Sequence, residues 1–388
     1  RTRNETRARA VLSLYLAIPL AYAVFALLSV AEVDRGFLLL SGLGALFATL
    51  THHVYSAHSR KGSMLSHRVL VFGVGEESQA VSGVLRKHDP DIQIVGFYPS
   101  ANETEFAVPQ QSVLPRDVSL SDTAHNFKVD EIIVAVRERR GGVLPLRELL
   151  DCKLSGVRVL DLASYFERAL GQIRLDSLRV GWLVFGEGFR QGWRRTSVKR
   201  LSDVVLAIIM LLLALPIMLL TALMIVLENG FPIFYRQERV GLDGRLFKVI
   251  KFRSMRTDAE SDGKPRWASA DDDRVTRVGR FIRKVRIDEL PQLYNVLVGD
   301  MSLVGPRPER PYFVDKLTRD IPFYAVRHSV KPGVTGWAQV CYPYGATVDD
   351  SIQKLQYDLF YVKNHTLFLD ILILFQTVGV VLTGKGAR

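Results

Sequence analysis

The sequence predicts an α/β membrane protein with three parts. These are an N-terminal transmembrane hairpin, a Rossmann-like doubly wound domain, and a compact α/β module with a re-entrant membrane helix. The 388-residue chain is 48% apolar with a mean hydropathy of +0.12, which is too apolar for an ordinary soluble protein of this length. Long apolar runs occur near the N-terminus and again in the second half of the chain. Between them, β-branched segments alternate with helical patterns.

The charge of the chain is unevenly distributed. The formal net charge is +11, from 51 basic and 40 acidic residues, which fits nucleic acid, anionic lipid or phosphorylated small molecules as partners. Residues 190–290 hold 20 basic and 12 acidic residues, so most of the excess stands beside the longest apolar run. This position favours lipid and phosphate over nucleic acid. Cys152 and Cys341 are too few for a disulfide scaffold or a Cys-rich zinc module.

Residues 1–60 are predicted to form a transmembrane helical hairpin. Residues 11–31 contain no charge and are long enough, at about 1.5 Å per residue, to cross a hydrocarbon core of about 30 Å. Residues 36–51 form a second, shorter run, which argues against a cleaved signal peptide. Basic residues flank the pair, so by the positive-inside rule both outer ends face the cytoplasm. Further spans before Arg1 are left open.

Residues 64–185 are predicted to form the Rossmann-like domain. A β-branched strand leads into Gly73 and Gly75, followed by an amphipathic helix and a second strand. The two glycines match part of a dinucleotide fingerprint, but Ser78 stands at the third glycine position. Two glutamates would also place negative charge at the helix N-terminus where a pyrophosphate binds. A structural or oligomerising module is therefore favoured over a nucleotide site.

Residues 201–227 form the longest apolar run, interrupted only by Asp203. Basic residues stand on both sides, so both ends favour the cytoplasmic face. Pro216 lies at the middle, where a proline removes a backbone donor and clashes with the preceding turn. We expect a break there into half-helices of about 15 and 11 residues that enter and leave on one face. A straight span with a tolerated kink is the alternative.

Residue types that handle phosphate follow this run. Strand alternation would place Lys251 and Arg253 on one side of their segment. The adjacent carboxylates Asp288 and Glu289 follow several arginines, and Arg307 lies between two prolines. Two carboxylates among arginines suit phosphoryl transfer, since one can attack phosphorus, another can hold Mg²⁺, and the guanidiniums neutralise the phosphates.

These patterns also have ordinary structural interpretations. Asp-Glu pairs in basic helices are commonly solvated ion pairs, and an arginine between prolines can simply shape a turn. Asp271 to Asp273 could bind a cation but are better explained as a loop face. His328 and His365 have no partner at metal-ligand spacing. Residues 368–382, too short to span and interrupted by polar residues, predict an interfacial C-terminal helix.

Residues 199–388 resemble the catalytic module of the monotopic phosphoglycosyl transferases, bacterial sugar transferases that start polysaccharide assembly on a polyprenyl phosphate. The matching features are Lys199-Arg200 with Asp203, RQERVGLDGRLFKVIKFRSM, IDELPQLYNVLVGDMSLVGPRP, and KPGVTGWAQV. They cover about half of the chain in continuous order, and the parts before them resemble the N-terminal extension of the large members. Family members often have Ser-Pro at the helix break, whereas this chain has Leu215-Pro216.

The resemblance implies that residues 186–388 form the catalytic domain, and it assigns roles by position. The residues with implied roles are the nucleophile Asp288, its Mg²⁺-binding neighbour Glu289, the phosphate-contacting Arg283 and Arg307, and Lys251 and Arg253 from a matching motif. A Mg²⁺ ion would lie at the two carboxylates, and Pro216 would mark the helix break.

The same resemblance implies a reaction in two displacements. Asp288 would attack the β-phosphorus of a UDP-sugar and release UMP, and undecaprenyl phosphate would take the sugar 1-phosphate from the aspartyl intermediate. This step would begin exopolysaccharide, capsule or O-antigen assembly on the cytoplasmic face of the bacterial inner membrane. A homodimer is expected by analogy with the large members.

Two other functional classes stay open from the sequence. One is a nucleotide-sugar oxidoreductase or epimerase that uses the Gly73/Gly75 module, with the remainder as a membrane anchor. The other is a non-catalytic membrane scaffold. No motif that we identify in the sequence distinguishes one hexose from another.

Overall fold

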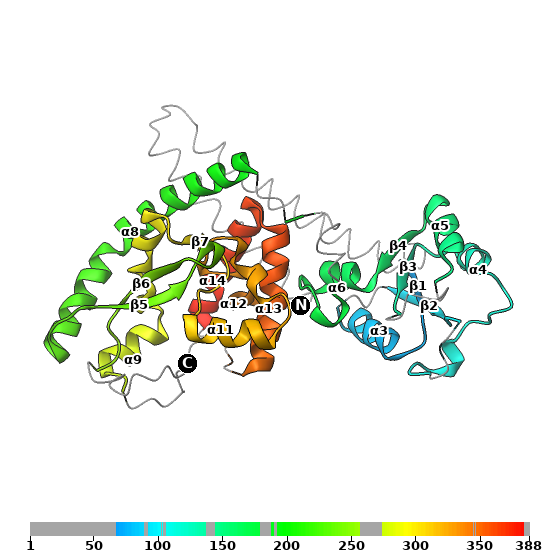
Figure 1. Ribbon diagram of the computed structural model, residues 1–388, viewed down its shortest axis with the longest axis horizontal. Helices are drawn as coiled ribbons and strands as arrows, with labels where there is room; N and C mark the ends of the chain where they lie inside the picture. Colours follow the sequence, from blue (N-terminus) through cyan, green and yellow to red (C-terminus); the bar gives the residue numbers. More distant parts are fainter. Residues whose placement is uncertain are drawn as a thin grey trace, which may run out of the picture. The chain divides into compact units, whose positions relative to one another are not determined.

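The computed structural model describes residues 67–88, 92–101, 103, 106–136, 144–178, 188–189, 192–256, 274–343, 345 and 347–383 (Figure 1). The predicted transmembrane hairpin at residues 1–60 lies outside them, as do Asp271 to Asp273. The chain forms two compact units, Arg1–Tyr165 and Phe166–Arg388. Each unit is described by itself, and the mixed α/β architecture that the sequence predicts is confirmed in both.

The N-terminal unit is built on a parallel sheet. In chain order its elements are β1 (Arg68–Phe72), α3 (Glu76–His88), β2 (Gln93–Tyr98), α4 (Leu120–Asn126), β3 (Glu131–Val134), α5 (Leu146–Leu154), β4 (Arg158–Asp161) and the start of α6 (Leu162–Leu170). Within the described residues the strands pair in the order β2-β1-β3-β4, all parallel. Consecutive residues of β1 and β3 are almost completely buried, as in a sheet that is covered on both faces.

The C-terminal unit is a more irregular α/β assembly. Its elements are α8 (Trp193–Asn229), β5 (Phe234–Val240), β6 (Leu246–Phe252), α9 (Arg277–Lys284), the 3-10 turn η4 (Ile287–Glu289), α10 (Gln292–Val298), β7 (Ser302–Val304), α11 (Pro311–Asp320), the 3-10 helix η5 (Tyr324–Ser329), β8 (Gly333–Thr335), α12 (Trp337–Cys341), α13 (Val348–Asn364) and α14 (Leu367–Thr383). β5 and β6 form an antiparallel pair, and β7 and β8 form a parallel pair. The core lies between α8, α10, α13 and β7, with Leu293, Met301 and Tyr361 among its buried residues.

The segment that follows α6 packs into the C-terminal unit. The Trp337 Nε1–H donates to the Gly171 carbonyl at 2.7 Å, and the Ile173 backbone N–H donates to the Gln356 carbonyl at 3.0 Å. Ile173 is fully buried among side chains of α11 and α13. The C-terminal unit therefore begins before residue 186, where the sequence predicted the start of the last of its three parts.

α8 is one helix of 37 residues that contains Pro216, and Figure 1 draws it as a continuous ribbon. The structure therefore differs from the two separate half-helices that we expected. A proline removes one backbone hydrogen bond, and its ring crowds the carbonyl of the preceding turn. A helix can continue through this position when the hydrogen bonds on both sides of it are kept. At about 1.5 Å per residue, α8 is long enough to cross a membrane, and most of its leucines are exposed.

Both ends of α8 are attached to the same compact unit. Near its N-terminus, buried Asp203 accepts a hydrogen bond from the Leu303 backbone N–H at 3.2 Å. At its C-terminus, the Glu228 carboxylate accepts from the backbone N–H groups of Arg277 at 2.8 Å and Val278 at 3.1 Å. The two ends of the helix are therefore fixed to one body, with the exposed apolar stretch between them.

The predicted C-terminal helix is confirmed as α14. Its apolar residues Phe368, Ile371 and Phe375 are exposed, while Asp370 is buried. Asp370 accepts a hydrogen bond from the Lys199 Nζ at 2.7 Å and another from the Tyr361 hydroxyl at 2.7 Å. The carboxylate that interrupts the apolar pattern therefore joins α14 to α8 and α13.

Candidate active site

Asp288 and Glu289 lie in the turn η4, between α9 and α10. Arg286 has a left-handed backbone conformation (φ 60°), which turns the chain sharply out of α9. Asp288 is 7% exposed and Glu289 is 8% exposed. Two buried neighbouring carboxylates are stable only where positive charge or hydrogen bonds compensate them.

Glu289 is surrounded by cations. Its Oε1 accepts hydrogen bonds from the Arg307 NH2 at 2.9 Å and the Lys251 Nζ at 3.0 Å, and the Arg286 NH1 lies 3.9 Å away. Burial alone would raise the pKa of Glu289, but Arg307, Lys251 and Arg286 together hold that pKa well below its usual value. This shift favours the charged form of Glu289, which binds the surrounding cations.

Asp288 is in a different state from its neighbour. Its Oδ1 is buried and accepts no hydrogen bond from the residues that the structure describes. Burial raises the pKa of Asp288, and the charge of Glu289 raises it further, against the opposing influence of Lys251, Arg283 and Arg307. Adjacent carboxyl groups with opposite pKa shifts are typical of sites that give the two groups different tasks. Asp288 Oδ1 accepts no hydrogen bond from the described residues, whereas Glu289 Oε1 accepts two.

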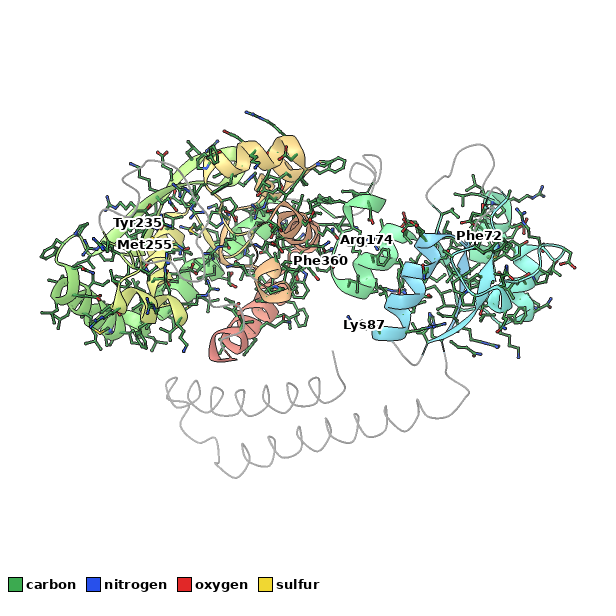
Figure 2. All side chains as sticks on the ribbon, turned by 90° about the horizontal axis from the view of Figure 1, so that it is seen from below. Phe72, Lys87, Arg174, Tyr235, Met255 and Phe360 are labelled. Carbon is green, nitrogen blue, oxygen red and sulfur yellow. The ribbon has the colours of Figure 1, made fainter. Side chains whose placement is uncertain are left out.

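A cavity of about 460 Å³ opens beside Asp288, a size that suits a small-molecule ligand. Tyr235 and Met255, which Figure 2 labels near one another, both line it. The cations in its lining are Arg239, Lys251, Arg253, Arg256, Arg274, Arg283, Arg286, Arg307, Arg310, Arg327 and Lys354. Asp288, Glu309 and Asp358 are the carboxylates in the lining. Such an excess of positive charge is suited to a ligand that carries several phosphate charges.

Arg283 reaches the cavity from the inner face of α9. Its Nε donates to the Ser254 hydroxyl at 3.0 Å. One turn earlier, Gly279 lies so close to the Ser254 backbone that an added methyl group would come within 2.0 Å of the Ser254 carbonyl oxygen. The glycine therefore allows the close contact that positions Arg283.

Arg307 is held by its backbone as well as by its side chain. Its carbonyl accepts from the Arg327 NH2 at 2.9 Å, and the neighbouring Pro308 carbonyl accepts from the Arg239 NH1 at 3.1 Å. Arg327 is 5% exposed and forms an ion pair with Asp358, which is 2% exposed, at 2.7 Å. Arg239, Arg327 and Asp358 were not predicted. They come from three different elements, and no local motif connects them.

Lys251, Arg283 and Arg307 lie near the carboxylates of η4, whereas the Arg253 side chain binds the C-terminal end of α8. β6 ends at Phe252, so the expected alternation does not continue through Arg253. The Arg253 NH2 donates to the carbonyls of Asn229 at 3.0 Å and Gly230 at 2.6 Å. A guanidinium there satisfies free carbonyls and stabilises the negative end of the α8 dipole. Arg253 still lines the cavity, so a phosphate contact stays a prediction.

The residues present fit a Mg²⁺ ion held jointly with phosphate oxygens. Mg²⁺ is commonly bound by one or two carboxylates together with the phosphates of a substrate, and the free Oδ1 of Asp288 meets that need. The Oε1 of Glu289 would have to exchange a cation contact to contribute. Among the described residues, no group of three or more His, Cys, Asp or Glu side chains could hold a metal by itself.

The turn at Gly73 and Gly75 is occupied by a side chain of this chain. The Glu103 carboxylate accepts hydrogen bonds from the backbone N–H groups of Val74 at 3.0 Å, Gly75 at 3.2 Å and Ser100 at 3.1 Å. The Val74 and Gly75 amides are the groups that an oxidoreductase interpretation would assign to a pyrophosphate. The geometry thus favours the structural interpretation of this unit.

Comparison with known proteins identifies similar sequences. Residues 194–384 match the family described as bacterial sugar transferase. A UDP-glucose:undecaprenyl-phosphate glucose-1-phosphate transferase of Xanthomonas campestris pv. campestris is 31% identical over 98% of this chain and 83% of its own length. A UDP-N-acetylgalactosamine-undecaprenyl-phosphate N-acetylgalactosaminephosphotransferase of Aeromonas hydrophila is 45% identical over 62% of this chain. The chain spans just over half of that relative, 56%.

Proposed function

Because this chain belongs to the bacterial sugar transferase family, we propose that it transfers a sugar 1-phosphate from a UDP-sugar to undecaprenyl phosphate. The observation that carries the proposal is the buried Asp288–Glu289 pair beside a cavity lined by cations. The exposed apolar surface of α8 on the same unit supports access to a lipid acceptor.

We propose that Asp288 is the nucleophile. Its carboxylate attacks the β-phosphorus of the UDP-sugar, the bond from that phosphorus to the bridging oxygen breaks, and UMP leaves with the electron pair. A phosphate oxygen of undecaprenyl phosphate then attacks the same phosphorus and releases the Asp288 carboxylate. Asp288 lines the cavity, which supports this assignment, while the Oε1 of Glu289 is engaged by Arg307 and Lys251.

The cations around the pair are proposed to neutralise the charge that builds up during transfer. Arg283 and Arg307 contact the phosphates, and Lys251 holds Glu289 in place. A bound Mg²⁺, held by Asp288 and Glu289, would supply further positive charge at the diphosphate.

The exposed apolar surface of α8 supports a placement at the membrane. The two ends of α8 are fixed to one body, which supports a position at one face of the inner membrane, with the catalytic unit on the cytoplasmic face. The phosphate of the undecaprenyl phosphate acceptor would lie at the level of the lipid headgroups, next to this unit. We propose that the product begins exopolysaccharide, capsule or O-antigen assembly. The N-terminal unit would serve as a Rossmann-like structural module, and a homodimer is the expected assembly.

The covalent step is tested by isotope exchange. The full-length protein is incubated with an unlabelled UDP-sugar, labelled UMP and Mg²⁺, without undecaprenyl phosphate. Label is expected to enter the UDP-sugar, because the first displacement is reversible. Running the assay with UDP-glucose, UDP-galactose and their N-acetylated analogues identifies the hexose. Exchange that requires the acceptor would instead indicate direct transfer and refute the aspartyl intermediate.

Gly279→Ala tests the placement of Arg283. The added methyl group would overlap the Ser254 carbonyl, so α9 must shift. A displacement of about 1 Å at a catalytic group can reduce the rate by about 100-fold. We expect a loss of this size in the exchange rate, together with a loss of about 1–3 kcal/mol in the free energy of unfolding.

A matched control is Gly83→Ala in α3. An added methyl group there has no neighbouring atom within 4 Å. Helix propensity predicts a small gain in stability, about 0.5–1 kcal/mol, and no change in exchange. Full activity in Gly279→Ala would show that the position of Arg283 does not depend on this close contact.

A further inference from the structure

The outer face of α9 has an unusual composition. Arg277, Arg280, Phe281 and Lys284 are exposed and occupy helix positions that share one face. Phe281 is 55% exposed in the middle of the three cations. The opposite side of the helix carries the fully buried Ile282. A short helix with one apolar ring surrounded by basic residues is typical of segments that lie at a membrane surface.

This face continues the apolar surface of α8. The Glu228 carboxylate binds the first backbone N–H groups of α9 and holds the start of that helix against the end of α8. Around this junction, Leu227 and Phe231 are each about three-quarters exposed. Apolar side chains next to cations match the order of acyl chains and headgroups in a bilayer. An acidic protein or a nucleic acid would match the cations but leave Phe281 in water.

We propose that the outer face of α9 docks onto anionic phospholipid headgroups, with Phe281 inserted below them. Each basic residue near an anionic leaflet strengthens binding by about fivefold. Arg277, Arg280 and Lys284 therefore give this face a preference for anionic over zwitterionic lipid, whereas α8 would accept either.

The docked helix also carries an active-site residue. Arg283 leaves the inner side of α9 and binds Ser254 in the lining of the cavity. Lipid contact on the outer side therefore stabilises the position of Arg283 on the inner side. This consequence for catalysis rests on the proposed function, while the docking itself does not.

The docking is tested without substrate, so that it stands apart from the transferase proposal. The full-length Phe281→Trp protein is placed in nanodiscs with brominated acyl chains, either of phosphatidylcholine alone or with added phosphatidylglycerol. The quenching of the introduced tryptophan is measured after subtraction of the wild-type tryptophan signal. We expect strong quenching that increases with phosphatidylglycerol.

Two charge variants in this background give the comparison. Arg280→Gln with Lys284→Gln is expected to remove most of the dependence on phosphatidylglycerol. Lys316→Gln with Arg319→Gln, two exposed cations on α11, is expected to leave it unchanged. Absence of quenching would overturn the proposal and leave the face for an acidic protein or nucleic acid. Quenching that is equal in both lipids, or equal losses in the two double variants, would overturn the preference for anionic lipid.

Discussion

Replacing Asp288 with asparagine is expected to abolish both turnover and UMP exchange. The amide keeps the shape of the side chain but has no carboxylate with which to attack phosphorus. Removal of a nucleophile commonly lowers kcat by about 10⁴-fold or more. The measurements are transfer to undecaprenyl phosphate and acceptor-free exchange, made on the full-length protein at equal concentrations.

Two further variants serve as comparisons for Asp288→Asn. Glu289→Gln weakens the attraction for Lys251 and Arg307, so its loss of activity should be smaller and accompanied by weaker donor binding. Asp300 is an exposed carboxylate twelve positions along the chain from Asp288, and Asp300→Asn should keep full activity. If Asp288→Asn still exchanges UMP, the nucleophile is another residue and the assignment fails.

Replacing Arg327 with methionine is expected to destabilise the protein strongly. The change leaves Asp358 buried without its partner and removes donors from the Tyr324 hydroxyl and the Arg307 carbonyl. Loss of one member of a buried ion pair typically costs about 3–5 kcal/mol. Denaturant unfolding of the full-length protein in detergent measures this loss.

The double variant Arg327→Met with Asp358→Leu separates stability from function. An apolar pair of similar volume often restores the stability of a buried ion pair, so most of the unfolding free energy should return. Exchange activity should stay low, because the Arg307 carbonyl still lacks its donor. Recovery of both quantities would show that Arg327 stabilises the fold without positioning Arg307.

The sequence was sufficient to predict the groups that are close along the chain or aligned by a strand. Asp288 and Glu289 are adjacent, and Lys251 lies on the strand that passes them, so their meeting could be expected from local patterns. Arg327 and Asp358 are 31 positions apart and pair only because η5 packs against α13. Nothing in either neighbourhood marks that contact.

Two other features depended on tertiary context. Pro216 predicted a broken helix, but a local rule for proline cannot account for the fixed attachments at both ends of α8. Gly73 and Gly75 predicted a turn with free amides, and the turn exists. The carboxylate that fills it comes from Glu103, about 30 positions along the chain, and no turn motif specifies that partner.

The segment after α6 determines where this protein can be shortened. The family match begins at residue 194, which suggests a natural start for an isolated catalytic fragment. Such a fragment would lack the carbonyl of Gly171 and the side chain of Ile173, and would open the side of the core beside Trp337 and Gln356 to solvent. A fragment intended for crystallisation should therefore keep the chain from Phe166 onward, well upstream of the boundary that sequence similarity alone would choose.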